Sequence, residues 1–299
     1  MGMNKVIDAF AFYNEVDMLE YRLETLYDYV DKFVIVEATM THSGLDKPLN
    51  FELNKKRYKK YSDKIHYVVN ENLQRSGELD KAHNPGHIPG VHTGGLFYKS
   101  NYNVMREYTH IDSIKRPLTY LDIDDNDIIL FMAPDEIPNP EVLVDFKKNG
   151  LGEVGVTLPL GQYFYDCEHF QERKDFEKDG WKTDFWYLSH ATTYGNLKSM
   201  FDDGYTVYDI RVIDWKHVPD AGWHLSWFES VQDKMNSIVH PNYKTDDELM
   251  YNVKNKKPMT LNSHNIFGLD MDYRLRKIKI TDNIFPPPNS EWWDERKKQ

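Results

Sequence analysis

The stretch Asp127-Ile128-Ile129-Leu130-Phe131-Met132-Ala133-Pro134-Asp135-Glu136-Ile137-Pro138 decides the fold class, because a continuously apolar run leads directly into two carboxylates. A short run that is apolar at every position is typical of a strand buried on both faces, as in a parallel sheet. Asn139, Pro140 and Glu141 follow in the order of a helix N-terminus, with a capping side chain, a proline and then an acid. The segment therefore predicts a strand, a polar turn and a helix.

Three further strands are expected upstream, at residues 6–10, 33–36 and 65–69, where apolar residues dominate. Between the first two, apolar side chains recur at spacings of three and four over residues 16–30, which is the helical period. Strands that alternate with helices indicate a parallel sheet with helices on its faces. We therefore predict an α/β fold with a mostly parallel central sheet flanked by helices.

The second half of the chain is richer in aromatic residues and less regular. Strands are expected near residues 154–159 and 162–165, and a helix near residues 230–239. Neither an internal repeat nor an obvious linker divides the chain. We expect one domain over residues 1–245 and a C-terminal extension over residues 246–299 that packs on the same domain.

Composition and charge exclude several classes of protein. A formal charge of -11 over 299 residues argues against a nucleic-acid partner, which requires a surplus of basic side chains. The basic run at residues 55–60 is interpreted as a solvated helix face. No run reaches the roughly 18 apolar residues that span a bilayer, and Cys167 is the single cysteine, so no intrachain disulfide forms. The first strand follows the N-terminus too closely for a signal peptide, so a cytoplasmic location is expected.

A long connection rich in glycine and proline spans residues 70–96. Connections usually take about 4–6 residues, and much longer ones are commonly functional. It contains His83, His87 and His92, but no regular element fixes their geometry as a metal site requires. A mobile flap over an active site is the favoured interpretation.

Polar clusters follow three of the predicted strands: Asn14 with Glu15, residues 37–44, and Asp135 with Glu136. In open parallel sheets, ligands bind outside the carboxyl ends of the strands. Carboxylates there accept hydrogen bonds from a ribose or a base, and one or two more can hold Mg²⁺ or Mn²⁺ that bridges phosphates. A nucleoside diphosphate is therefore a ligand that these clusters suit.

Less specific interpretations apply to the same residues. Asp135 and Glu136 can equally form a polar turn ahead of a well-capped helix. His224 lies between aromatic residues, where a histidine is commonly a hydrogen-bonded core residue.

Five blocks of sequence, in order from about residue 6 to 240, carry a family resemblance. They are residues 8–23, residues 30–38 continued by Gly44 and residues 47–51, Arg106 with Glu107, residues 127–138 and residues 220–226. Together they resemble glycosyltransferase family 17, which includes the animal enzyme that adds the bisecting N-acetylglucosamine to N-glycans. The resemblance implies a GT-A type, Rossmann-like fold that binds nucleotide sugars. It also implies inverting transfer of N-acetylglucosamine, or another hexose or pentose, from a nucleoside diphosphate, with UDP expected, to a glycan or glycolipid acceptor.

The resemblance also suggests where the donor lies. In this hypothesis, the nucleoside and the diphosphate are contacted by Asn14, Glu15, Glu37, Arg106 and Asp135, and a divalent cation, Mn²⁺ or Mg²⁺, by Asp135 and His224.

One position departs from the family pattern. The family motif reads Asp-x-Asp-Glu-Ile-Pro, and Ala133 replaces its first aspartate. Either Asp135 and His224 hold the cation with fewer protein ligands, or the dependence on metal is weakened, or position 133 was altered. Tight metal binding is therefore less strongly implied than donor binding.

An inverting transfer needs a carboxylate that takes the proton of the acceptor hydroxyl. Asp220 is the favoured candidate, with Glu136 and Glu229 as alternatives. Aromatic rings that could stack on sugar faces, or form ordinary core, are Tyr163, Tyr165, Trp181, Trp186, Trp223 and Trp227.

Two other classes of protein are weighed. A glycan-binding protein derived from such an enzyme would explain Ala133 as lost catalysis. A phosphohydrolase would need an aspartate nucleophile with a second acid two residues later, but Asp8 is followed by Ala9 and Phe10.

Overall fold

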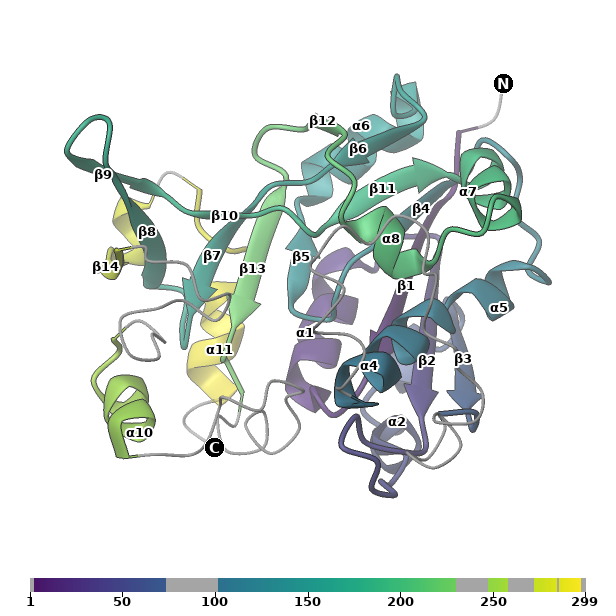
Figure 1. Cartoon of the computed structure of the whole chain (residues 1–299), viewed down its shortest axis with the longest axis horizontal. Helices are drawn as coiled ribbons and strands as arrows, with labels where there is room; N and C mark the ends of the chain where they lie inside the picture. Colours follow the sequence, from purple (N-terminus) through teal and green to yellow (C-terminus); the bar gives the residue numbers. More distant parts are fainter. Residues whose placement is uncertain (1–2, 74–101, 230–246, 258–271, 284, 297–299) are drawn as a thin grey trace.

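Two seven-stranded sheets organise the computed structural model, which describes residues 3–73, 102–229, 247–257, 272–283 and 285–296 (Figure 1). The strands of the first sheet are, in spatial order, β12 (Lys216–His217), β6 (Gly155–Thr157), β11 (His190–Thr193), β4 (Ile128–Phe131), β1 (Val6–Phe12), β2 (Lys32–Ala38) and β3 (Ile65–Asn70). β4, β1, β2 and β3 are parallel neighbours, and β11 runs antiparallel to both β4 and β6. The predicted α/β fold is confirmed, and the four strands predicted from apolar runs are observed as β1, β2, β3 and β4.

Helices cover both faces of this sheet because the side chains of β1 alternate between two apolar clusters. Phe10 and Phe12 pack on one side, and Ile7 and Ala9 on the other. The first cluster includes residues of α1 (Val16–Leu26) and α6 (Pro140–Asn149). Residues of the remaining nearby helices enter the second cluster or lie over it: α4 (Tyr102–Asp112), α5 (Lys115–Leu118), α7 (Tyr194–Asp202) and α8 (Val207–Arg211).

The start of α6 forms as its sequence predicts. The side chain of Asn139 accepts a hydrogen bond from the backbone N–H of Glu141 at 3.0 Å, and Pro140 occupies the first helical position. This cap fixes where the helix begins, and therefore the length of the segment that links it to β4.

The second sheet was not predicted. Its main path is β14 (Tyr273–Lys277), β8 (His169–Asp175), β7 (Leu160–Phe164), β13 (Gly222–Ser226) and β5 (Glu136–Pro138), with β10 (Phe185–Trp186) on β7 and β9 (Gly180–Thr183) on β8. Asp135 directly precedes β5, and His224 lies in β13. The second sheet therefore brings both residues to the turn that follows β4 of the first sheet.

The C-terminal residues pack on the same body. β14 extends the second sheet, and α11 (Ser290–Arg296) places Trp293 against Tyr21 of α1, with ring centroids 5.2 Å apart. The remaining short elements are α2 (Asn50–Asn54), η1 (Lys59–Tyr61), α10 (Asp247–Lys254) and η3 (Ile280–Asp282).

The basic run was predicted as a helix face, and this part of the prediction is wrong. α2 ends at Asn54, and residues 55–60 form turns and the start of η1. The four lysines of the run are exposed as expected, but Arg57 pairs with Asp17 and Glu20 of α1.

The histidines His83, His87 and His92 and the helix expected near residues 230–239 lie outside the described residues. In the described ranges, no helix combines the length and apolar character of a membrane span.

Candidate functional site

A buried ion pair ties β1 to the turn that follows β4. Arg22 donates from Nε and Nη2 to the two carboxylate oxygens of Asp8, at 2.7 and 2.6 Å, and neither side chain is exposed. The third nitrogen, Nη1, donates to the carbonyl oxygens of Ala133 at 3.0 Å and Glu136 at 2.6 Å. The turn at residues 133–136 is therefore held in place through its main chain.

Glu136 holds the same turn from its other side. Its carboxylate accepts hydrogen bonds from the backbone N–H of Ala133, the indole of Trp186, the hydroxyl of Ser189 and the guanidinium of Arg211. Both oxygens have two donors, and only 1% of the residue is exposed. This arrangement suits Glu136 to positioning the turn and leaves its carboxylate poorly placed to accept an acceptor's proton.

Asp135 lies in the turn that Arg22 and Glu136 hold, and there it meets His224, although 89 positions separate the two residues in the sequence. Asp135 Oδ2 lies 3.6 Å from His224 Nε2, and both side chains are largely buried. The backbone N–H of Leu225 in β13 donates to the carbonyl of Asp135 at 2.8 Å, which sets the two segments side by side. The ring of Trp186 lies over His224, with centroids 4.6 Å apart.

The spacing of this pair fits a shared divalent cation. Two ligand atoms about 2.1 Å from one Mg²⁺ lie roughly 3–4 Å from each other. Among the described residues, no group of three His, Cys, Asp or Glu side chains could hold a metal ion. A cation at Asp135 and His224 would therefore take most of its ligands from phosphate oxygens and water, as Mg²⁺ commonly does.

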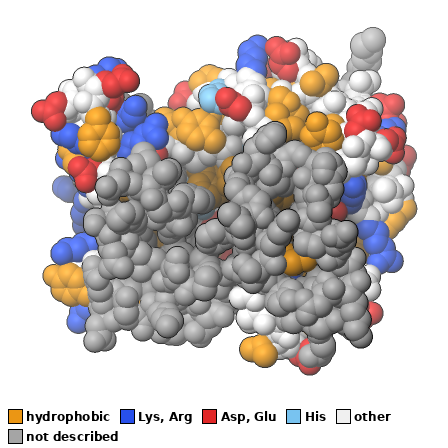
Figure 2. Space-filling model, viewed as in Figure 1, with side chains coloured by type: hydrophobic (Ala, Val, Ile, Leu, Met, Phe, Trp, Pro, Cys, Tyr) orange, Lys and Arg blue, Asp and Glu red, His pale blue; other side chains and the backbone are white. Residues whose placement is uncertain are grey.

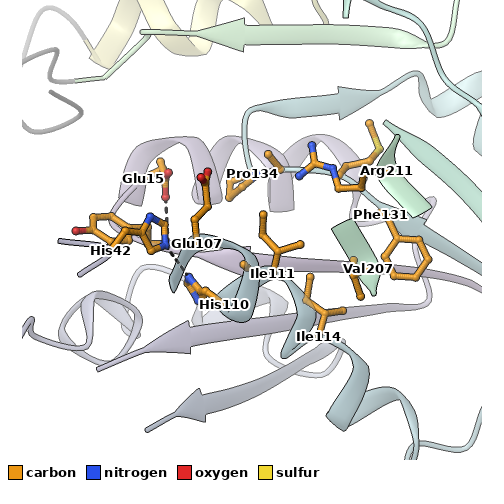
Figure 3. Close-up of a pocket in the computed structure, with 14 residues that line it drawn as sticks. Glu15, His42, Glu107, His110, Ile111, Ile114, Phe131, Pro134, Val207 and Arg211 are labelled. Atoms are coloured by element: carbon orange, nitrogen blue, oxygen red, sulfur yellow. Dashed lines mark hydrogen bonds between the residues drawn. The ribbon is translucent and has the colours of Figure 1, made fainter. Parts of the chain in front are cut away.

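A cavity of about 140 Å³ lies beside the turn (Figure 3). That is many times the roughly 10–15 Å³ that one water needs, so a ring-sized group fits. Ala133 and Pro134 line it from the turn, and Ile111, Ile114 and Val207 supply apolar walls from the helix side. Its polar lining comes from Tyr13, Glu15, His42, Glu107, His110 and Arg211.

Burial in the cavity wall shifts the pKa of one lining carboxyl, Glu107. Burial raises its pKa to about 7, although the positive charge of Arg211 acts in the opposite direction. Its side chain accepts no hydrogen bond from the residues that the structure describes. A carboxyl in this state can exchange a proton or bind a hydroxyl group near neutral pH. Sequence reasoning placed Glu107 in a matched block but gave it no role.

The family model described as glycosyltransferase family 17 matches residues 2–269, which include both sheets' site segments and the cavity. The chain belongs to glycosyltransferase family 17. The resemblance stated from the sequence is thereby confirmed. The curated proteins compared with the chain include no significant match.

In this family 17 glycosyltransferase, two residues that were predicted to contact the donor instead form hydrogen bonds with the protein's own backbone. Glu37 is fully buried, and its carboxylate accepts from Lys47 Nζ, Tyr67 Oη and the backbone N–H groups of Asn50 and Phe51. The structure therefore places it beneath the segment after β2 and away from the cavity.

Arg106 is likewise 2% exposed and donates to the carbonyl of His42 at 2.9 Å. Its guanidinium packs on Gly44, which has φ +88, and a Cβ there would lie 2.9 Å from Arg106 Nη2. Glycine at this position therefore lets Arg106 brace residues 42–44.

The segment after β1 does reach the cavity. Glu15 lines it, and its carboxylate accepts from the backbone N–H of Tyr13 at 3.2 Å and of Asn14 at 3.0 Å. Asn14 contributes this backbone contact but is not part of the cavity lining.

The favoured base, Asp220, lies at the other end of β13. It is exposed, it belongs to the turn before Gly222, and it is not part of the cavity lining. Glu229 lies at the start of α1 and accepts from the backbone N–H of Asp17 at 2.6 Å. Burial, followed by the nearby charge of Glu15, raises its pKa to about 8. Neither carboxylate is brought to the cavity.

Most of the aromatic candidates are core residues in the enzyme. Tyr163, Tyr165, Trp223 and Trp227 are at most 8% exposed. Trp181, on β9 of the second sheet, has Lys174 and Arg274 over its ring and is not part of the cavity lining. Trp186 contacts both Glu136 and His224.

Proposed function

We propose that this family 17 glycosyltransferase transfers a sugar from a nucleoside diphosphate donor to a hydroxyl of a glycan or glycolipid, with inversion at the anomeric carbon. The transferred group is N-acetylglucosamine or another hexose or pentose. The observation that carries the proposal is the convergence of Asp135 and His224 at the turn after β4, whose residues Ala133 and Pro134 line the cavity although the pair itself does not.

The donor is proposed to lie with its nucleoside in the cavity and its diphosphate toward Asp135 and His224. Glu15 and Glu107 line the cavity and supply carboxyl oxygens that can accept hydrogen bonds from ribose hydroxyls. This arrangement follows the general rule for open parallel sheets, in which ligands bind outside the carboxyl ends of the strands.

Asp135 and His224 are the residues that would hold Mn²⁺ or Mg²⁺. Bound there with a diphosphate, the cation would offset the negative charge that develops on the departing nucleoside diphosphate. Arg22, Glu136 and Trp186 keep the pair in position, and Ala133 contributes no carboxylate.

Inversion requires a single displacement. The acceptor oxygen forms a bond to the anomeric carbon, the bond from that carbon to the phosphate oxygen breaks, and the acceptor's proton passes to a base. Three observations weigh against these candidates as that base. The carboxylate of Glu136 is fully hydrogen-bonded, Asp220 is exposed outside the cavity lining, and Glu229 holds a backbone N–H of α1.

Thermal-shift measurements with a panel of nucleotide sugars, with and without Mn²⁺, test the proposal, because a ligand that binds only the folded state raises its apparent stability. We expect at least one nucleotide sugar to raise the Tm, and the same donor to support transfer to a glycan. Stabilisation by glycans, with neither a donor response nor donor hydrolysis, would instead favour a glycan-binding protein.

A further inference from the structure

A row of polar side chains crosses the second sheet and begins at the candidate cation site. His224 of β13 lies opposite Glu136 of β5 on one side and opposite Gln162 of β7 on the other. The antiparallel register of β7 and β8 then places Gln162 opposite Gln171. Residues opposite one another on adjacent strands point to the same face of a sheet, and such strands lie about 4.8 Å apart. The row therefore continues from the cation site across β13, β7 and β8, which are neighbours in Figure 1.

Asp184 joins the two glutamines of this row. Its Oδ2 accepts a hydrogen bond from Nε2 of Gln162 and another from Nε2 of Gln171, each at 2.7 Å. Because a carboxylate oxygen only accepts, each carboxamide directs its NH₂ group to Asp184 and keeps Oε1 as an acceptor. Within the described ranges, no donor reaches either Oε1 atom, and Gln162 is only 7% exposed. The cluster therefore holds two acceptors of fixed orientation that suit a ligand with hydrogen-bond donors.

A cation and an aromatic ring flank the two glutamines. Arg173 lies two residues beyond Gln171 on β8 and therefore on the same face, with Nε 3.8 Å from Asp184 Oδ1 and a side chain that is 35% exposed. Trp186, two residues beyond Asp184, is partly exposed, and its ring lies over His224. Side chains that accept and donate hydrogen bonds beside an aromatic ring suit a ligand with many hydroxyl groups and apolar C–H faces, which describes a sugar.

We propose that Gln162, Gln171 and Asp184 bind hydroxyl groups of the acceptor glycan. This inference rests on the proposed function and adds the residues that receive the acceptor. A hydroxyl group donates one hydrogen bond and accepts others, so it can donate to Oε1 of a glutamine and accept from Arg173. Because Gln162 lies on the strand next to His224, a sugar bound there lies beside the position proposed for the donor's diphosphate.

Gln162→Met and Gln171→Met test the proposal, because methionine keeps most of the length and volume of the side chain but lacks the carboxamide. Binding of the methyl glycosides of glucose, galactose, mannose and N-acetylglucosamine is followed by saturation-transfer NMR, with UDP and Mn²⁺ present. We expect wild type to bind at least one glycoside and each variant to bind it about 5–10-fold more weakly, the loss that one hydrogen bond represents. The affinity for UDP, measured by calorimetry, should not change.

Asn283→Leu is the matched control, because it also removes a carboxamide beside β7. Asn283 Nδ2 donates to the hydroxyl of Tyr163 at 2.8 Å, and Tyr163 points to the opposite face of β7 from Gln162. This variant should bind the glycoside as tightly as wild type does. A cluster that only stabilises the sheet would lower the Tm of the two methionine variants and leave their glycoside affinity unchanged, and that result overturns the inference.

A wild-type protein that binds none of the four glycosides also overturns the inference, and this measurement needs no variant to fold. If the same protein still binds a nucleotide sugar and transfers its sugar to a glycan, the proposed function stands. A protein that neither binds a nucleotide sugar nor transfers a sugar overturns the proposed function as well.

Discussion

Arg22 contacts Asp8 through two nitrogens and the turn carrying Asp135 through the third, so one side chain joins the first strand to the candidate cation site. Lys, Arg, Asp and Glu side chains are seen on the surface of the face shown in Figure 2, whereas neither Arg22 nor Asp8 is exposed, so their ion pair lies inside the core.

Arg22→Met should therefore lower the free energy of unfolding by about 3–5 kcal/mol, because it leaves the carboxylate of Asp8 buried without its partner. Urea denaturation followed by circular dichroism measures this change. Arg274→Met is the control, since Arg274 is exposed where it pairs with Glu172, and about 1 kcal/mol or less is expected. Equal losses in the two variants would contradict the role assigned to Arg22.

Asp135→Asn should weaken Mn²⁺ binding and reduce sugar transfer by about 10²-fold or more, because it removes one of only two protein ligands proposed for the cation. Transfer rates measured across a Mn²⁺ titration report both effects. Asp145→Asn on the exposed face of α6 is the matched substitution and should behave as wild type. Full activity of Asp135→Asn at every Mn²⁺ concentration would remove this residue from the site.

Ala133→Asp should raise the affinity for Mn²⁺ by roughly 10-fold, because it adds a carboxylate at the edge of the cavity beside Asp135. The recorded hydrogen bonds of Ala133 to Arg22 and Glu136 are made by its main chain, so the Tm should change by only a few degrees. Calorimetric titration with Mn²⁺ gives the affinity. An unchanged affinity in a folded variant would place the cation elsewhere.

Asp220→Asn tests the base that the sequence favoured. Loss of a general base lowers turnover by about 10²–10⁴-fold with donor affinity little changed. Asp220 is exposed and is not part of the cavity lining, which leads us to expect less than about a 3-fold change in turnover. A drop of two orders of magnitude at unchanged donor affinity would restore Asp220 as the base.

Glu107→Gln should change the pH dependence of stability. Burial raises the pKa of Glu107 from 4.5 to about 7, so the folded state favours the protonated carboxyl. Its stabilising contribution is full below about pH 4.5 and is lost as the pH rises through 7. Glutamine stays neutral, so the variant should gain on the order of 1–3 kcal/mol relative to wild type between pH 5 and pH 8. Urea unfolding at both pH values measures the gap, with the exposed Glu71→Gln as control; a gap that does not widen would contradict the burial of this charge.

The sequence predicts well what depends on neighbouring residues. β4 and the start of α6 follow from a continuous apolar run and from the cap at Asn139, which are local signals. The second sheet depends on pairing between short strands far apart in the chain, such as β14 with β8, and no local pattern specifies that pairing.

The same division applies to the candidate site. The family resemblance suggested Asp135 and His224 as ligands of one cation, and the structure places the two side chains 3.6 Å apart. Whether a carboxylate can bind a ligand depends on whether residues elsewhere in the chain already donate hydrogen bonds to it. Glu37 accepts hydrogen bonds from Lys47 and Tyr67, and nothing in the sequence around Glu37 indicates this.

The turn before β5 is held by hydrogen bonds to its backbone atoms, so its conformation does not depend on which side chain stands at position 133. The hydrogen bonds of residue 133 use its main chain, so a different side chain at this position leaves them intact. Position 133 can therefore gain a carboxylate, and with it a further ligand for a cation, while the surrounding scaffold keeps its shape.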